Sequence, residues 1–245
     1  MFPIRDLNPT RITPLVTIVL VLANIFVWLF WQPKLEPEQE LEFLYRRAAV
    51  ACEVTTGEPL TVEEFQSETC VDGSGGNVIF PEKSPYQSVV VSLFLHGGIA
   101  HLLGNMWFLW LFGNNVEEAY GHVRYLLVYL LAGVAATLGF ILLHLDSTTP
   151  LVGASGAIAG VLGSYLVLYP THLVLSWAFI TVVPVPAVLF LGLWFVGQFA
   201  VGDVGVAWEA HVAGFLLGAV VTLLFRGALR GRVDSLHART SRALW

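Results

Sequence analysis

The chain has 245 residues, of which 56% are hydrophobic and 12% are charged, and its formal net charge is -6. Soluble domains carry roughly twice this charged fraction, and the mean hydropathy of +0.72 is typical of a protein embedded in lipid. The composition therefore excludes an ordinary soluble domain, and it gives no indication of nucleic-acid binding.

Apolar segments long enough to cross a bilayer recur along the chain, so we expect an all-α membrane protein with six spanning helices. The helices are expected at residues 12–31, within 89–112 from about 99, at 123–143, at 151–169, within 173–200 and at 206–225. The membrane domain then covers residues 12–226, between an N-terminal segment 1–11 and a basic tail 227–245.

Two of these segments need comment. The first is too long for a signal peptide and lacks a cleavage site, so we expect it to be retained as a helix. The fifth helix is expected in the C-terminal part of its segment, after Pro184 and Pro186. The stretch before it, residues 173–183, either lies at the membrane interface or belongs to the fifth helix.

Arginine residues flank the expected helices on one side, which sets the orientation of the chain. Arg5 and Arg11 precede the first helix, and Arg124 lies between the second and third. Five arginines follow the sixth helix: Arg226, Arg230, Arg232, Arg239 and Arg242. The loops 146–150 and 201–205 contain neither lysine nor arginine. We therefore expect both termini in the cytoplasm, in the plasma (inner) membrane of a prokaryote.

The polar segment 32–86, between the first two helices, is then extracytoplasmic and holds both cysteines, Cys52 and Cys70. Because that compartment is oxidising, we predict a disulfide, which contributes on the order of 3 kcal/mol to local order. The alternative is two free thiols with no role. The sequence contains no Cys/His cluster with zinc-ligand spacing, so we expect neither a metal nor another cofactor.

Four polar side chains lie at one depth inside the expected helices, where polar groups are costly. Ser155 is expected about four residues into the fourth helix, and His211 about five residues into the sixth. His101 and Asn105 lie one turn apart on one face of the second helix. Since these three helices all run inward, we expect the four side chains together near the extracytoplasmic face.

The chemistry of this set is that of a serine hydrolase. A serine hydroxyl becomes a nucleophile when an imidazole accepts its proton, so Ser155 and His211 form a candidate dyad. The Asn105 amide, a His101 ring N–H and the Ser155 backbone N–H are candidate donors to an oxyanion. Taken singly, each residue has a structural alternative: a packing serine, an interhelical hydrogen bond, or a clasp between His101 and Asn105.

Glycine residues accompany the candidate dyad. Gly153 allows an unusual backbone angle just before the serine. Two small-xxx-small faces are expected to let the fourth and sixth helices approach closely, as a contact between Ser155 and His211 requires. These faces consist of Gly156, Gly160, Gly214 and Gly218.

The motifs "HGGIAHLLGN", "GASG" and "AHVAGFLLG" resemble those of the rhomboid family of intramembrane serine proteases, and the resemblance covers about residues 85–225. It implies a six-helix rhomboid-like bundle with a long loop after the first helix. It also implies a catalytic dyad of Ser155 and His211, with an oxyanion hole formed by His101, Asn105 and the Ser155 amide. Further family positions are His96 before the second helix and the structural pair Glu117 and Gly121, and we count Gly153 and Gly156 as supporting residues.

The sequence departs from the family pattern at two places. Many members carry a tyrosine one turn after the serine, stacked under the histidine, where this chain has Ala159. Many also carry Trp-Arg where this chain has Gln87 and Ser88. The first departure leaves open what holds the imidazole of His211.

Other functions fit the sequence less well. A metalloprotease needs ligand spacing such as HExxH, and an intramembrane aspartyl protease needs two buried aspartates, whereas Asp146 and Asp203 are expected in loops. A transporter is expected to carry charged residues near the midplane. A non-catalytic rhomboid-like scaffold or client-binding protein typically loses the serine or the histidine. We therefore expect an endopeptidase that contacts membrane lipids and cleaves single-pass transmembrane proteins.

Overall fold

A computed structural model describes the chain except for residues 34–35, 72–75, 179, 201–205 and 243–245, and for the side chains of residues 240–242. The described chain is mostly helical. Parts of the expected outer segment and of the basic tail lie outside the described residues. So does the whole loop 201–205, which contains Asp203.

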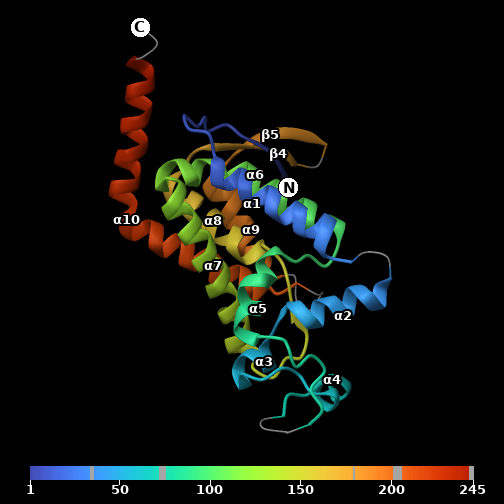
Figure 1. The fold of residues 1–245 in the computed structure, drawn as a ribbon. Helices are drawn as coiled ribbons and strands as arrows, with labels where there is room; N and C mark the ends of the chain where they lie inside the picture. Colours follow the sequence, from blue (N-terminus) through green and yellow to red (C-terminus); the bar gives the residue numbers. More distant parts are fainter. Residues whose placement is uncertain (34–35, 72–75, 179, 201–205, 243–245) are drawn as a thin grey trace.

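Each of the six expected apolar segments contains a helix (Figure 1). The helices are α1 (Leu15–Phe26), continued by the π-helical turn η1 (Val27–Trp31), α6 (Ile99–Tyr120), α7 (His122–Leu143), α8 (Ser155–Leu168), α9 (Ala187–Gln198) and α10 (Trp208–Arg242). Helix α8 lies at the centre, because most of its residues are buried and it packs against α6, α7 and α10. Its many glycines and alanines allow these neighbours to approach closely.

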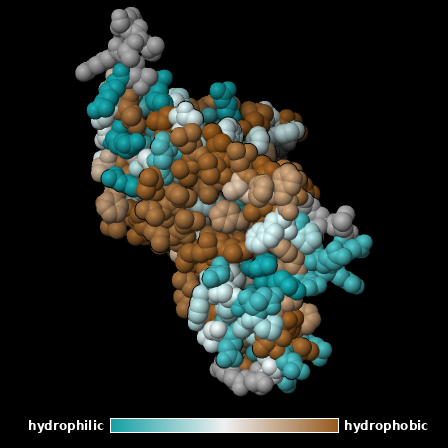
Figure 2. Space-filling model, viewed as in Figure 1, coloured by the Kyte–Doolittle hydropathy of each residue, from teal (hydrophilic) through white to brown (hydrophobic). Residues whose placement is uncertain are grey.

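The apolar surface of the molecule is that of a membrane protein. Among the described residues, the helices His122–Leu143 and Trp208–Arg239 are long and apolar enough to cross a membrane, and the bent pair Pro85–Phe94 and Ile99–Tyr120 adds a third if it acts as one span. Helix α8, with 14 residues, rises roughly 21 Å and is shorter than a bilayer core. Figure 2 shows a broad hydrophobic band between more hydrophilic ends. The count of six spans stays a prediction.

Several helix ends differ from the expected ones for local reasons. Helix α8 begins at Ser155 rather than at residue 151, because Pro150–Leu151 forms the short strand β3. Helix α6 continues past residue 112 to Tyr120, where Gly121, with a φ of 76°, ends it. Helix α10 continues through most of the expected basic tail.

A small sheet makes the all-α expectation wrong in part. Strands β1 (Phe2–Asp6), β4 (Leu173–Ala178) and β5 (Thr181–Pro186) form an antiparallel sheet in the order β1–β4–β5. The described residues of the stretch 173–183 thus belong mainly to the paired strands β4 and β5 and not to the fifth helix. Valine favours strands, and the prolines of β5 are tolerated because β5 is an edge strand.

The segment between α1 and α5 (Pro85–Val91) folds as a small subdomain, which we call the cap, residues 36–83. Its helices are α2 (Pro37–Arg47), α3 (Ala51–Thr56) and α4 (Val62–Ser67). In Figure 1 the cap lies at the opposite end of the molecule from the C-terminal end of α10 and from the sheet.

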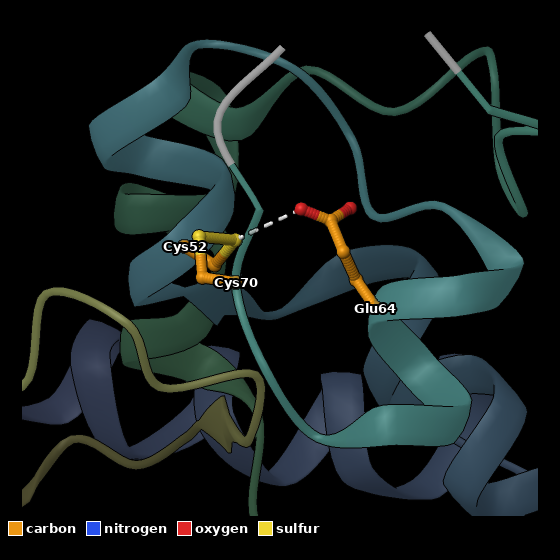
Figure 3. A group of neighbouring side chains, drawn as sticks. All are labelled: Cys52, Glu64 and Cys70. Atoms are coloured by element: carbon orange, nitrogen blue, oxygen red, sulfur yellow. Dashed lines mark hydrogen bonds between the residues drawn. A yellow bond between two sulfur atoms is a disulfide. The ribbon is translucent and has the colours of Figure 1, made fainter. Parts of the chain in front are cut away.

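The predicted disulfide between Cys52 and Cys70 is confirmed (Figure 3). The carboxylate of Glu64 lies beside it and accepts hydrogen bonds from the N–H groups of Val71 and Thr61, at 3.0 and 2.9 Å. Burial disfavours the ionised carboxylate, but these hydrogen bonds outweigh it and hold the pKa of Glu64 below its usual range. Because both sulfurs are in the disulfide, they are not thiolate ligands for a metal.

A buried ion pair adds to the small core of the cap. Glu53 and Lys83 contact each other, and both side chains are almost fully buried. The carboxylate also accepts the Leu60 N–H at 3.0 Å, and the ammonium donates to the Tyr45 carbonyl at 2.6 Å. Burial raises the pKa of Glu53 and lowers that of Lys83, and each partner opposes the shift of the other. The centre of the cap is therefore polar, and its two charged side chains are paired with each other and with backbone groups.

Candidate active site

Ser155 is the first residue of α8, where a backbone N–H has no acceptor within the helix. Gly153 has a φ of 124°, a conformation that favours glycine. A Cβ at this position would lie 2.8 Å from Nε2 of His101 and 3.4 Å from Oγ of Ser155. The unusual backbone angle expected at Gly153 is therefore present, whereas the expected position of Ser155 four residues inside its helix is wrong.

His211 lies in the first turn of α10 and faces Ser155. Its Nε2 is 2.8 Å from Oγ of Ser155, a hydrogen-bonding distance. Where Nε2 is unprotonated, the hydroxyl donates to it, which is the arrangement that a candidate nucleophile and base require.

The two helices that carry this pair touch through glycine. A Cβ on Gly214 would overlap the carbonyl oxygen of Gly156, and a Cβ on Gly218 would overlap that of Gly160. The predicted close approach of the fourth and sixth helices is thus confirmed. A larger residue at Gly214 or Gly218 would push α8 and α10 apart and lengthen the distance between Ser155 and His211, whereas a Cβ at Gly156 or Gly160 would first meet an alanine of α7.

The second nitrogen of the imidazole has a partner that the sequence analysis missed. Nδ1 of His211 is 2.6 Å from Oε1 of Gln198, the last residue of α9. The indole of Trp194 lies against the imidazole, with ring centroids 6.1 Å apart. One signal was present in the sequence, because Gln198 is a polar residue at the end of an otherwise apolar segment, close to the depth of His211.

A cavity of about 910 Å³ opens beside the pair and is lined by His101 and Asn105 as well as Ser155 and His211. Nδ2 of Asn105 is buried and has no acceptor among the described residues. An unpaired donor of this kind is available to a negatively charged oxygen in the cavity. The four polar side chains that the sequence placed at one depth therefore line a single cavity.

Comparison with known protein families assigns this region to one of them. The Rhomboid domain matches residues 83–228, which is more than half of the chain. The chain belongs to the rhomboid family. The resemblance seen in the sequence motifs is thereby confirmed.

The rhomboid relatives are matched over part of their length. Rhomboid protease GluP of Bacillus subtilis is 46% identical over 78 residues, which are 32% of this chain and 15% of that protein. RHOMBOID-like protein 5 of Arabidopsis thaliana is 31% identical over 140 residues, 55% of this chain and 44% of that protein. Rhomboid protein 1, mitochondrial, of Saccharomyces cerevisiae is 31% identical over 146 residues, which are 54% of this chain and 40% of that protein. The chain spans less than half the length of each.

His96, a supporting residue expected from the resemblance, lies behind His101. Its side chain is fully buried, and the two imidazoles meet edge to face with centroids 5.1 Å apart. Gln32 holds the backbone of His96 on both sides, accepting its N–H at 3.1 Å and donating to its carbonyl. His96 thus supports the wall of the rhomboid cavity rather than contacting Ser155.

The structural pair expected from the resemblance, Glu117 and Gly121, lies at the far end of α6 and not in the cavity. The carboxylate of Glu117 is buried and accepts the N–H groups of Val16 and Thr17, each at 2.8 Å. Because these groups belong to the first turn of α1, Glu117 caps that helix. Gly121 ends α6 and lets the chain turn into α7.

The cap is bonded to the segment that leads to Ser155. Strand β2 (Ala49–Val50) pairs with β3, so that Ala49 lies opposite Leu151. The N–H of Cys52 donates to the Ser147 carbonyl at 3.0 Å. The N–H of Ala49 donates to Oγ of Ser92, in the turn η2 (Ser92–Phe94), at 2.6 Å. The cap therefore lies at the same end of the rhomboid domain as the candidate site.

Proposed function

We propose that this rhomboid-family chain is an intramembrane serine endopeptidase that hydrolyses peptide bonds of single-pass transmembrane proteins. The observation that carries the proposal is the 2.8 Å contact between Oγ of Ser155 and Nε2 of His211. The unpaired amide donor of Asn105 in the same cavity supports it, as does the similarity to a relative that is named a rhomboid protease.

The first half of the reaction forms an acyl-enzyme. Oγ of Ser155 attacks the carbonyl carbon of the peptide bond while its proton moves to Nε2 of His211. The carbonyl oxygen becomes an oxyanion, stabilised by Asn105, His101 and the Ser155 N–H. When the tetrahedral intermediate collapses, the C–N bond breaks and the amine leaves with the proton from His211. The N-terminal fragment remains as an ester on Ser155.

The second half releases this fragment. A water molecule attacks the ester carbonyl and gives a proton to Nε2 of His211. Collapse of the second intermediate breaks the ester bond and returns the proton to Oγ of Ser155. The product is a carboxylic acid, and neither step needs a metal or a cofactor.

We further propose that residues 12–226 form a six-span domain, with both termini in the cytoplasm of a prokaryote and the site facing the extracytoplasmic side. The arginine pattern supports this orientation. The disulfide of the cap also supports it, because disulfides persist in oxidising compartments and the cap lies at the same end of the molecule as Ser155. Substrates and lipids reach the site from the surrounding bilayer.

The proposal is tested with the purified protein in lipid vesicles and a single-pass transmembrane reporter. We expect the wild type to cleave the reporter with or without EDTA, and Ser155→Ala and His211→Ala to abolish cleavage while remaining folded. Ser88→Ala, on α5, tests for a general effect of removing a serine hydroxyl and is expected to leave cleavage intact. Retained cleavage in Ser155→Ala would refute the proposal, and a wild type that binds the reporter without cleaving it would favour the scaffold alternative.

A further inference from the structure

We infer that Gln198 is a positioning residue for His211: it holds the imidazole in the one tautomer that can accept the proton of Ser155. The inference rests on the proposed function, since it concerns how the same serine is activated. Ala159 lacks the ring that stacks under this histidine in many rhomboid members. Gln198, at the end of α9, orients the imidazole instead.

The orientation of the Gln198 amide is set by the backbone. Nε2 of Gln198 donates to the Trp194 carbonyl at 3.0 Å, one turn earlier in α9. A carbonyl oxygen only accepts, so the amide nitrogen must be the atom on that side. The oxygen Oε1 is therefore the atom that faces Nδ1 of His211, at 2.6 Å.

This orientation determines the tautomer of the imidazole. Oε1 of an amide only accepts, so Nδ1 of His211 must carry a proton in order to bond to it. In a neutral imidazole the other nitrogen, Nε2, is then the unprotonated one. Nε2 is the atom that lies 2.8 Å from Oγ of Ser155. Trp194, Gln198, His211 and Ser155 thus form a chain of hydrogen bonds that leaves the base free to accept a proton.

The surroundings make this contact strong. Gln198 is 7% exposed, and a hydrogen bond in a dry site is stronger than one in water. The titratable groups that act on His211 are His101 from α6 and Glu209 from its own helix. Glu209 is in turn bonded to His144 of α7, at 2.8 Å. From α9, the amide of Gln198 and the indole of Trp194 face the imidazole, and neither of these groups is charged.

Two variants separate positioning from packing. Gln198→Met keeps the length of the side chain but removes the oxygen that accepts the Nδ1 proton of His211. The imidazole is then no longer held in the tautomer with an unprotonated Nε2. Gln198→Glu restores an acceptor and adds a negative charge that favours the protonated imidazole. Gln87→Met, at an exposed position of α5, is the matched control. For each protein we would measure reporter cleavage in vesicles and the rate of labelling by a fluorophosphonate, across the pH range in which imidazole titrates.

We expect Gln198→Met to lower kcat and the labelling rate on the order of 10- to 100-fold with little change in KM, because it removes part of the general-base contribution, which is typically about 100- to 10,000-fold. Gln198→Glu should recover much of the rate, and the acidic limb of its profile should move to higher pH. Wild-type rates and an unshifted profile in both variants would overturn the inference while leaving the proposed function intact. A wild type that neither cleaves nor labels would overturn the proposed function, and the inference with it. If Gln198→Met fails to fold, the pH shift of Gln198→Glu decides alone.

Discussion

Oγ of Ser155 and Nε2 of His211 lie 2.8 Å apart although 56 residues separate them in the chain. They come from two helices whose backbones touch, with Gly214 against Gly156 and Gly218 against Gly160. The distance between nucleophile and base is therefore a property of how closely α8 and α10 pack.

We expect Gly214→Ala to lower both stability and cleavage, because its Cβ would overlap the carbonyl oxygen of Gly156. Forcing a methyl group into such a contact typically costs about 1–3 kcal/mol. Gly227→Ala, in the same helix, is the control, since a Cβ there would meet no described atom within 4 Å. Thermal unfolding in detergent and reporter cleavage measure the two effects. Equal behaviour of the two variants would mean that α8 and α10 are not in close contact.

Asn105→Ala is expected to lower kcat roughly 100-fold or more, with little effect on KM. The reason is that one oxyanion donor typically contributes about 3 kcal/mol in the transition state. Steady-state kinetics on the reporter measure both constants, and Asn77→Ala, at an exposed position in the cap, serves as control. A raised KM with an unchanged kcat would instead assign Asn105 to substrate binding.

Reduction of the disulfide between Cys52 and Cys70 should loosen the cap and change cleavage only a few-fold. The bond closes a loop of 18 residues, which is worth about 3 kcal/mol to the cap, but the cap contributes no side chain to the dyad. Hydrogen exchange before and after reduction should show faster exchange in α3 and α4, with α8 unchanged. Complete loss of cleavage would show that Ser155 depends on the cap far more than we propose.

The same cysteines test the topology. An impermeant thiol reagent should label them in intact cells after reduction and not before. Labelling that requires permeabilised cells would place the cap, and with it the candidate site, in the cytoplasm.

Stability is expected to depend on pH through Asp6, in strand β1. Burial raises the pKa of Asp6 to about 6, although hydrogen bonds from Tyr165 and the Asn8 N–H oppose the shift. The pKa of Asp6 in the folded protein lies above the ordinary value of 3.8, so folding favours the protonated carboxyl. The resulting stabilisation is complete below pH 3.8 and is lost as the pH rises through 6. The Tm should therefore fall more steeply over this range in the wild type than in Asp6→Asn. The exposed Asp146→Asn should behave as wild type, and identical slopes for all three would contradict this account.

The sequence predicted that Ser155, His211, His101 and Asn105 would lie together, because hydropathy locates the apolar helices that carry them, and the four residues line one cavity. It predicted the start of α8 poorly, because residues 151–154 are as apolar as a helix, and the break appears only in the structure, in strand β3 and in the backbone angle of Gly153. The hairpin β4–β5 was missed for a similar reason, since a short apolar run fits a strand as well as a helix.

The partner of His211 could not be predicted in the same way. Gln198 and His211 come from different helices, and their contact depends on how α9 lies against α10, which periodicity does not report. The cysteine pair was simpler, because two cysteines in one polar segment allow a single intramolecular bond.

The most direct test of the account is the mass of the protein after treatment with a fluorophosphonate, which reacts with activated serines. We expect one adduct per chain on the wild type, mapped by peptide sequencing to Ser155, with no adduct on Ser155→Ala and much slower labelling of His211→Ala. An adduct of equal yield on wild type and Ser155→Ala, or its location on another serine, would contradict the assignment of Ser155 as the nucleophile.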